Sequence, residues 1–460
     1  MKNSTALQTS APAPAAATTN ACKLCMPLGA SLAFKGVEGA VPFLHGSQGC
    51  ATYMRRYLIS HFREPVDIAS SALGETQAVF GGGPNLKKGL VNVINKYRPR
   101  LVGVATTCLT ETIGDDVPAI LKEFRAAAKV EGGDLPELVS ASTPAYGGTH
   151  VEGFHAAVTA VVKTLTQPTP PHPGVNLLPG LVSPADLRHL AAILADFGLA
   201  GTILPDFSDT LDAPALEEYE ILPSGGTPLT AIRAMGGAAA TLEFGATLGP
   251  NSAGTWLAER WGVPLHSLGL PLGLRESDAF YAALEEVSGR ETPPEHAGAR
   301  GRLVDAMVDG HKYLSGKRAV VYGEEDLVVG LASWLAELGV QPVLCASGAS
   351  SGRLAAGVAR VTEGLSRINP QVASGADFAQ IGEWARELAP DLLVGHSKGY
   401  RIARELGVPL VRVGFPIHDR LGGTRLHHLA YLGAQELLDR IVNALLAHTQ
   451  DASPVGYGYL

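Results

Sequence analysis

Apolar segments of strand length alternate with helical patterns along most of the chain. Short apolar runs at Val41–Leu44 and Leu101–Ala105 each lead into a turn and then into a helical pattern. The same order recurs in residues 175–207, 317–346 and 391–415. This alternation predicts α/β layers built on mostly parallel sheets.

The pattern divides the chain into three α/β blocks behind a tail. Residues 1–19 are rich in Ala, Pro and Thr and lack the apolar run of a secretory signal, so we expect a disordered tail. The first predicted domain covers residues 20–170 and ends in the Pro-rich segment QPTPPHPG. The second covers residues 171–312 and the third residues 313–460. A chain of 460 residues is too long for one ordinary core, which agrees with this division.

Composition narrows the classes of function. The net charge is -8, and no basic stripe with interleaved aromatic residues is present, so we expect no nucleic-acid partner. No apolar run approaches the roughly 18 residues of a membrane span. Five cysteines are too few for a disulfide framework in a chain of this length, which favours a reducing cytoplasm.

Three of the cysteines stand where ligands of open α/β sheets collect. Cys50 and Cys108 each follow a predicted strand, and Cys25 precedes a helix that opens at Pro27. The carboxyl ends of parallel strands border the ligand crevice, and helix N-termini stabilise thiolates. Because thiolates are the ligands of iron–sulfur clusters, a cluster site of Cys25, Cys50 and Cys108 is one interpretation. Gly29, Gly46 and Gly49 would let the backbone approach such a centre closely.

The other two cysteines have simpler interpretations. Cys345 lies in an apolar segment, where a thiol is usually a small buried hydrophobe. Cys22 and Cys25 form a CxxC pair that could bind zinc, but no second pair of ligands with zinc spacing follows. We expect Cys22 to be a flexible thiol at the end of the tail.

Several polar residues near the predicted turns are candidates for structural roles. His45 is expected to satisfy the Gly-rich turn that follows its strand, and Asp115 or Asp116 to cap the next helix. His396 and Lys398, in the segment GHSKG, are interpreted as solvated turn residues.

Several long motifs resemble the β-subunit branch of the nitrogenase component 1 family. The similarity is closest to the scaffold group, NifN, which serves biosynthesis of the iron–molybdenum cofactor. The resemblance covers nearly the whole chain after the tail and implies three Rossmann-like, doubly wound parallel-sheet domains. The motifs, in order along the chain, are CMPLGA, PFLHGSQGCATYMRRYLISHFREPV, AVFGGGPNL, TTCLTETIGDD and VPLVRVGFPIHDR.

The resemblance also implies a site and partners. In catalytic β-subunits, cysteines at the positions of Cys25, Cys50 and Cys108 bind the P-cluster, an eight-iron relay at the interface with the α-subunit. The scaffold group instead shares a [4Fe–4S] cluster with a NifE-like subunit, and Cys50 matches the ligand from this side. The partner subunit mainly holds the precursor of the FeMo cofactor. These features imply an α2β2-type heterotetramer that meets the nitrogenase iron protein, its reductase, and a donor of the cofactor precursor.

Two features favour the scaffold group, and one leaves the number of ligands open. Ala145, in STPAYGGTH, stands in the place of the serine that catalytic chains carry in a TPS motif near the P-cluster. Only residues 1–21 precede Cys22, whereas catalytic chains generally have a longer amino-terminal extension. All three cysteines are present, however, whereas some scaffold chains keep only the counterpart of Cys50. Arg63, in HFREP, either offsets cluster charge or forms an interface or surface ion pair.

Three alternatives to the scaffold role remain. The first is a catalytic molybdenum–iron protein β-subunit whose P-cluster delivers electrons for N2 reduction. The second is a related reductase of a tetrapyrrole pathway, which the motifs VGFPIHDR and HGSQGC disfavour. The third is a zinc-stabilised binding module built on Cys22 and Cys25.

Overall fold

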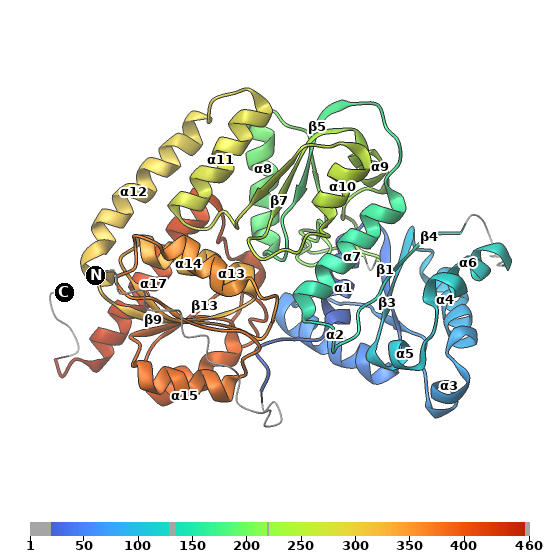
Figure 1. Ribbon diagram of the computed structural model, residues 1–460, viewed down its shortest axis with the longest axis horizontal. Coiled ribbons are helices and arrows are strands. Elements are labelled where there is room, and N and C mark those ends of the chain that lie inside the picture. Colours follow the sequence, from blue (N-terminus) through green and yellow to red (C-terminus); the bar gives the residue numbers. More distant parts are fainter. Residues whose placement is uncertain (1–19, 128–134, 219, 456–460) are drawn as a thin grey trace, which may run out of the picture.

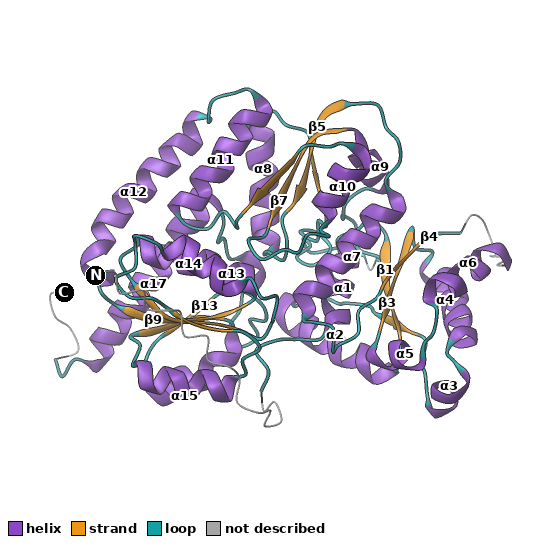
Figure 2. Ribbon diagram, viewed as in Figure 1, coloured by secondary structure: helices purple, strands orange, loops and turns teal. Residues whose placement is uncertain are grey.

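The described residues form three parallel sheets with helices packed against them (Figures 1 and 2). The computed structural model describes residues 20–127, 135–218 and 220–455, so the tail predicted at residues 1–19 lies outside them. Neighbouring strands within each sheet run parallel. The predicted α/β class with doubly wound parallel sheets is confirmed.

The first sheet has the strand order β2-β1-β3-β4. Its strands are β1 (Ala40–His45), β2 (Ala69–Ser70), β3 (Leu101–Thr106) and β4 (Glu137–Ala141), and its helices are α1 (Met26–Lys35), α2 (Gln48–Phe62), α3 (Glu75–Phe80), α4 (Gly83–Tyr97), α5 (Cys108–Ile113), α6 (Val117–Ala127) and α7 (His150–Leu165). Both β1 and β3 are buried along their whole length, as apolar runs between two helical layers should be. The strand order reverses between β1 and β3, and such a reversal marks the crevice where ligands of open α/β sheets bind.

The second sheet has the order β6-β5-β7-β8. Its elements are β5 (His172–Leu178), α8 (Pro184–Asp196), β6 (Gly201–Ile203), α9 (Leu229–Ala234), the 3-10 turn η1 (Met235–Gly237), β7 (Ala238–Phe244), α10 (Ala253–Trp261), β8 (Leu265–Leu268), α11 (Leu274–Ser288) and α12 (Pro294–Leu314). The Ser183 hydroxyl accepts the backbone N–H of Asp186 and so caps α8, which then begins at Pro184.

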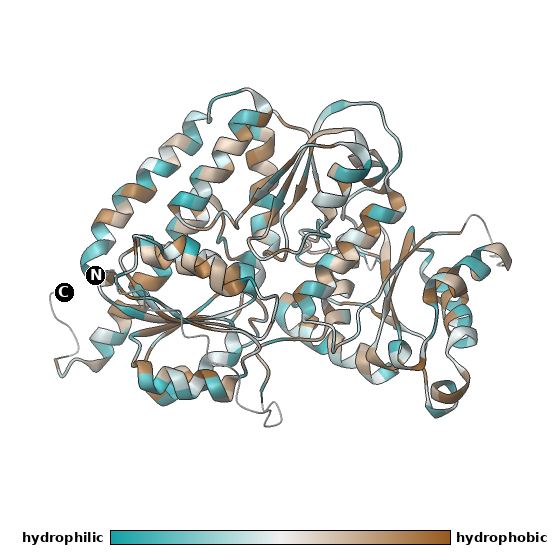
Figure 3. Cartoon of the chain, in the orientation of Figure 1, coloured by the Kyte–Doolittle hydropathy of each residue, from teal (hydrophilic) through white to brown (hydrophobic). Residues whose placement is uncertain are grey.

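The third sheet has the order β11-β10-β9-β12-β13, with its reversal between β9 and β12. Its elements are β9 (Arg318–Gly323), α13 (Glu325–Glu337), β10 (Gln341–Ser347), α14 (Leu354–Thr362), β11 (Gln371–Ala373), α15 (Phe378–Leu388), β12 (Leu392–Gly395), the 3-10 turn η2 (Ser397–Gly399), α16 (Tyr400–Leu406), β13 (Leu410–Arg412), the 3-10 turn η3 (Gly423–Arg425) and α17 (Ala430–Ala452). The strands are mostly hydrophobic, whereas outer helices such as α12 and α15 alternate polar and apolar residues (Figure 3).

One cluster of buried side chains runs through all three sheets and includes Leu44, Leu177 and Val321. Helix α12 packs against α17, so the carboxyl-terminal helix also contacts the segment before β9. The predicted domain boundaries at residues 170 and 312 stay predictions, because this core is continuous. Among the described residues, none of the helices combines the length and the apolar character that crossing a membrane requires.

Helices α1 and α7 pack with their backbones in contact, and this packing fixes the start of α1. All ten residues of α1 are buried. A Cβ atom on Gly29 would lie 1.6 Å from the His150 carbonyl oxygen, and one on Gly153 would lie 1.9 Å from the Met26 carbonyl oxygen. The expectation that Gly29 makes room for an inorganic centre is therefore wrong, because Gly29 makes room for α7.

We predict that Gly29→Ala destabilises the chain by about 3 kcal/mol, because the added methyl group forces two buried helices apart. Gly301→Ala is the matched control, since Gly301 lies in α12 with nothing within 4 Å of its Cβ position. That change should stabilise the chain by up to about 1 kcal/mol through helix propensity. Urea unfolding followed by circular dichroism measures both, and equal stabilities would contradict the packing argument.

Candidate functional site

Three cysteines lie at the starts of three helices. Cys25 immediately precedes α1, Cys50 is the third residue of α2, and Cys108 is the first residue of α5. At these positions a thiolate faces the positive end of a helix dipole and free backbone N–H groups. The predicted position of Cys25 at a helix start is confirmed, and Cys50 and Cys108, which were expected in turns after strands, also lie in the first turn of a helix.

Cys50 and Cys108 flank the reversal of strand order in the first sheet. Strand β1 leads into α2 and β3 leads into α5, and the two strands pair in register, with His45 opposite Thr106. Both thiols therefore lie at the carboxyl edge, where ligands of such sheets collect. Helix α5 was not expected from the sequence, which suggested only a turn at Cys108.

The three thiols are close enough to influence one another electrostatically. Burial raises the pKa of the Cys25 thiol, and the neighbouring Cys50 and Cys108 raise it further, while Lys23 and Lys398 act in the opposite direction. Cys25 and Cys50 are half-buried and Cys108 is exposed, and all three are free of disulfides. Three adjacent thiolates repel one another, so a bound cationic centre would stabilise all three together. The donor set suits a thiolate-ligated metal cluster.

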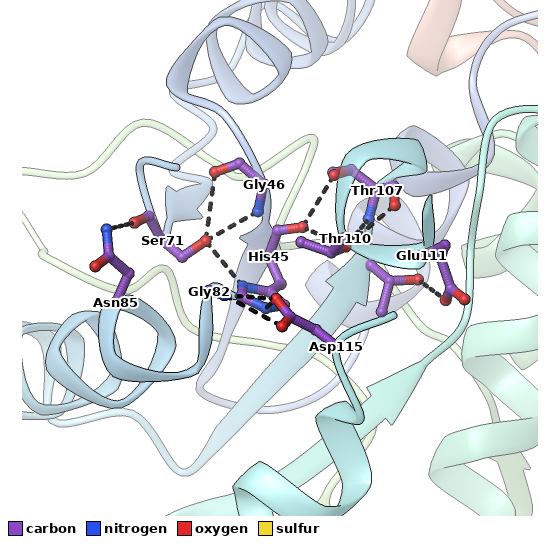
Figure 4. Close-up of polar contacts among 10 residues, drawn as sticks. His45, Gly46, Ser71, Gly82, Asn85, Thr107, Thr110, Glu111 and Asp115 are labelled. Atoms are coloured by element: carbon purple, nitrogen blue, oxygen red, sulfur yellow. Dashed lines mark hydrogen bonds and ion pairs between the residues drawn. The ribbon is translucent and has the colours of Figure 1, made fainter. Parts of the chain in front are cut away.

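The loop before Cys50 is fixed by a buried polar network around His45 (Figure 4). His45 Nδ1 lies 2.9 Å from Ser71 Oγ, and His45 Nε2 lies 2.9 Å from Asp115 Oδ2. Ser71 Oγ also accepts the Gly46 backbone N–H at 2.9 Å. The predicted role of His45 in satisfying the Gly-rich turn agrees with these contacts. Burial lowers the pKa of His45 although Asp115 opposes this, which favours the neutral ring.

The His45 carbonyl oxygen joins the loops of Cys50 and Cys108. It accepts the Thr107 backbone N–H at 3.2 Å and the hydroxyl groups of Thr107 and Thr110 at 3.0 Å each. Gly46 allows this approach, because a Cβ atom there would lie 2.4 Å from the Thr107 hydroxyl oxygen. A small residue is therefore required at Gly46, as predicted, but the group that approaches it is the neighbouring loop at Thr107.

Asp115 and Asp116 have different partners. Asp115 accepts the Gly82 backbone N–H at 2.9 Å as well as contacting His45, and so ties the start of α4 to β1. Asp116 accepts the Ala119 backbone N–H at 3.0 Å. The capping residue of α6 is therefore Asp116, and the sequence did not separate the two.

A fourth loop, between β4 and α7, borders the same edge and carries Ala145. Gly147 in this loop packs near Met26, the residue after Cys25, since its Cβ position is 3.3 Å from Met26 Sδ. The side chain of Tyr146 is 69% exposed. Ala145 offers no side-chain oxygen or nitrogen to a ligand at this edge.

The structure does not bring together every residue that the sequence suggested. Gly49 is exposed at the start of α2, with only Ser47 Oγ near its Cβ position, at 3.5 Å. Arg63 caps the opposite end of α2, thirteen residues from Cys50 and therefore roughly 20 Å away along the helix. Its guanidinium donates to the His418 carbonyl oxygen at 3.2 Å.

Cys22 is buried in the third sheet's core, not a flexible thiol as expected. Only 4% of Cys22 is exposed, and its Sγ lies 3.8 Å from His396 Nε2. Burial raises the pKa of Cys22 to about 12, so the group is a neutral thiol. Cys22 belongs to the hydrophobic cluster of the third sheet and Cys25 packs against the main core, so the pair does not form a common zinc site. Cys345 is fully buried, as expected.

The interpretation of His396 and Lys398 as solvated turn residues is also wrong. His396 is 3% exposed, and Lys398 is half-buried in η2. Lys398 Nζ donates to the Ala21 carbonyl oxygen at 3.2 Å. Sequence reasoning named Lys398 but gave it the wrong surroundings, and it missed Ser71, Thr107 and Thr110, since each contacts a partner distant in the chain.

Comparisons with known proteins agree with this geometry. The family described as nitrogenase component 1 type oxidoreductase matches residues 25–446. The nitrogenase molybdenum-iron protein beta chain of Clostridium pasteurianum is 35% identical over 428 residues, which cover 93% of each chain. The nitrogenase iron-molybdenum cofactor biosynthesis protein NifN of Bradyrhizobium diazoefficiens is 34% identical over 443 residues, covering 95% of this chain and 91% of that protein.

Two solved structures resemble this one. A chain of the structure titled "Nitrogenase Cp1 at pH 6.5" superposes with a TM-score of 0.93 at 32% identity and covers 99% of both chains. A chain of "Nitrogenase Cp1 at pH 5" reaches 0.68 at 16% identity, covering 96% of this chain and 92% of that one, and supports the fold alone. Catalytic and biosynthetic relatives are similar to this chain to almost the same degree, so identity does not separate the two roles.

Replacing Asp115 by Ala should destabilise the chain by about 3 kcal/mol, because the buried Gly82 N–H and the His45 ring lose their partner. Asp116→Ala is the control and should cost about 1 kcal/mol, the usual value of a lost cap. Chemical unfolding of both variants measures the difference. Similar losses for the two would contradict the central role of Asp115.

Stability should fall as the pH drops from about 6.5 towards 4. Burial lowers the pKa of both His61 and His396 to about 4, whereas the unfolded residues titrate near 6.5. Between these values the unfolded chain binds the protons and the folded chain does not, so each histidine removes up to about 1.4 kcal/mol per pH unit. Urea unfolding at several pH values tests this, and His396→Asn should flatten the profile.

Proposed function

Because this chain belongs to the nitrogenase component 1 family, we propose that it is a scaffold subunit for assembly of the FeMo cofactor. With a NifE-like partner it forms an α2β2-type heterotetramer and shares an interfacial [4Fe–4S] cluster. The observation that carries the proposal is the convergence of Cys25, Cys50 and Cys108 at one edge of the first sheet. The free thiols agree with a cytoplasmic location.

The donor set and its surroundings favour a site completed by a partner. A cubane takes four ligands, and this edge offers three thiols, of which Cys108 is exposed. Helix α3 contacts α5 and has no buried residues, and its Val79 and Phe80 are 76% and 82% exposed. Apolar side chains exposed beside a ligand set indicate a protein interface.

Within this site, we assign Cys50 as the principal ligand from this chain. The network of His45, Ser71 and Asp115 holds the loop before Cys50, and the His45 carbonyl holds the loop of Cys108 against it. When bound, the cluster supplies one-electron transfer between the reductase iron protein and a cofactor precursor held mainly by the partner. The chain itself orients thiolates and excludes water from the buried side of the site.

The scaffold role is preferred over catalysis because of the loop between β4 and α7. Ala145 lies in this loop, whose Gly147 packs near Met26 of α1, and it offers no oxygen ligand, where the resemblance expects a serine in catalytic chains. The second candidate is a catalytic molybdenum–iron β-subunit with a P-cluster. It is favoured by the presence of all three cysteines at one edge and by relatives named as beta chains.

Cys50→Ala should lower the iron content of the purified heteromer at least threefold, because it removes the principal ligand. Cys345→Ala is the control, since it removes a thiol buried in β10 and should leave iron unchanged. Iron analysis together with thermal unfolding separates loss of a ligand from loss of the fold. Unchanged iron in the Cys50 variant would defeat the assignment.

The two candidate functions differ in iron content and in turnover. The scaffold should show the S = 1/2 signal of a reduced cubane in electron paramagnetic resonance after dithionite, at about one cluster per αβ pair. It should not reduce acetylene when supplied with the iron protein and ATP. Eight irons per pair at this site with acetylene reduction would establish the catalytic role instead.

A further inference from the structure

Residues 20–25 form a strap, here called the amino-terminal strap, that crosses from the third sheet to the first. Its first residues pair with α15, where the Phe378 N–H donates to the Asn20 carbonyl at 2.8 Å. Its last residues pair with α7, where His150 and Leu24 exchange hydrogen bonds of 2.9 and 3.3 Å. Cys25, the next residue of the strap, begins the cysteine site.

The strap lies in the ligand crevice of the third sheet. The strand order of this sheet reverses between β9 and β12, and the turns after these strands carry Glu324 and His396. Cys22 enters there, with Sγ 3.8 Å from His396 Nε2. A Cβ atom on Gly348, after β10, would lie 2.4 Å from the Cys22 carbonyl oxygen, so the fit is close. The crevice that usually binds a ligand in such a sheet here binds the chain itself.

Lys398 contacts both segments that carry thiols. Its Nζ donates to the Ala21 carbonyl of the strap at 3.2 Å. The same Nζ lies 5.7 Å from the ring centre of Tyr57 on α2. Tyr53 and Tyr57 follow Cys50 by three and seven residues, which places them on one face of α2, and their ring centres are 4.8 Å apart.

Lys398 has no salt-bridge partner among the described residues, although the buried carboxylate of Glu324 acts on the same Cys22 thiol in the opposite direction and more strongly. In residues 20–127, 135–218 and 220–455, the ion pairs do not include Lys398. Its ammonium group lies between the strap, at Ala21, and helix α2, at Tyr57, the two segments that lead to Cys25 and carry Cys50. A half-buried cation that is not in a salt bridge with the described acids keeps part of its electrostatic effect on a nearby anionic site.

We propose that Lys398 is a positioning residue of the cysteine site: it fixes the strap that presents Cys25 and places a positive charge beside the bound cluster. The inference rests on the proposed function, since it needs a cluster at this site. Reduction adds one electron, which the iron protein supplies, and no bond to Lys398 forms or breaks. A nearby cation stabilises the more negative, reduced state and therefore raises the reduction potential.

The test is a redox titration of the purified heteromer, with the cluster followed by electron paramagnetic resonance. Lys398→Met should shift the equilibrium towards the oxidised state about threefold to tenfold, where tenfold equals about 59 mV for one electron. Lys398→Arg keeps the charge and should stay close to the wild type. Lys312→Met is the matched control, because Lys312 stacks on Tyr313 at 4.6 Å in the distant helix α12.

The outcomes separate this inference from the proposed function. A wild-type heteromer without iron would overturn the proposed function itself. A wild-type heteromer with its cluster, and the same potential in Lys398→Met and Lys312→Met, would overturn the role of Lys398 alone. If Lys398→Arg changes the reduction potential as much as Lys398→Met does, the charge is not the cause and the proposal also fails. A further outcome is that Lys398→Met loses iron while its unfolding transition stays normal. If Lys398→Arg then keeps its iron, that result supports the proposal, because it shows that Lys398 holds the strap that presents Cys25.

Discussion

The cysteine site depends on one buried residue, His45, at the end of β1. Its side chain bonds Ser71 and Asp115, and its carbonyl oxygen takes three donors from the turn before and within α5. One residue thus holds the loops of Cys50 and Cys108 together without any contribution from the thiols. The thiols are not needed to hold these loops, because the backbone around them is already satisfied; Cys50 Sγ accepts one long hydrogen bond from Ser47 Oγ, at 4.0 Å.

The packed core beneath the cysteine site explains how one chain can hold part of a ligand set in place before a partner completes it. Cys25 is held by a helix that is buried on all sides and packs against α7 through glycine, so it moves only if the core moves. The open side of the site faces outward, where Cys108 and the side chains on α3 are exposed. Because burial and the neighbouring thiols raise the pKa of Cys25, a cation that binds there must displace its proton, and a partner that covers the site strengthens that binding by excluding water.

Much of this arrangement could be predicted from local sequence. Parallel sheets, and the placement of Cys50 and Cys108 after strands, follow from short apolar runs and from turn residues next to them. Cys22, His396 and Lys398 were misjudged because their surroundings come from residues more than 370 positions away in the chain. The polarity of GHSKG indicates a turn, which is correct, but it does not indicate that another segment covers the turn. The role of Gly29 was mistaken for the same reason, since its neighbour is α7 and not a ligand.

The CxxC spacing of Cys22 and Cys25 illustrates how the same residue type takes two roles within one short segment. Cys22 is a neutral thiol within the third sheet's core, where its size and its contact with His396 suit a crevice that would otherwise be open. Cys25 stands at a helix start beside two other thiols and is available to a metal. The strap is anchored at both ends, so only a few residues of chain separate its contacts with the third sheet from Cys25. The cysteine site at the first sheet is thereby joined to the third sheet through the protein's own backbone.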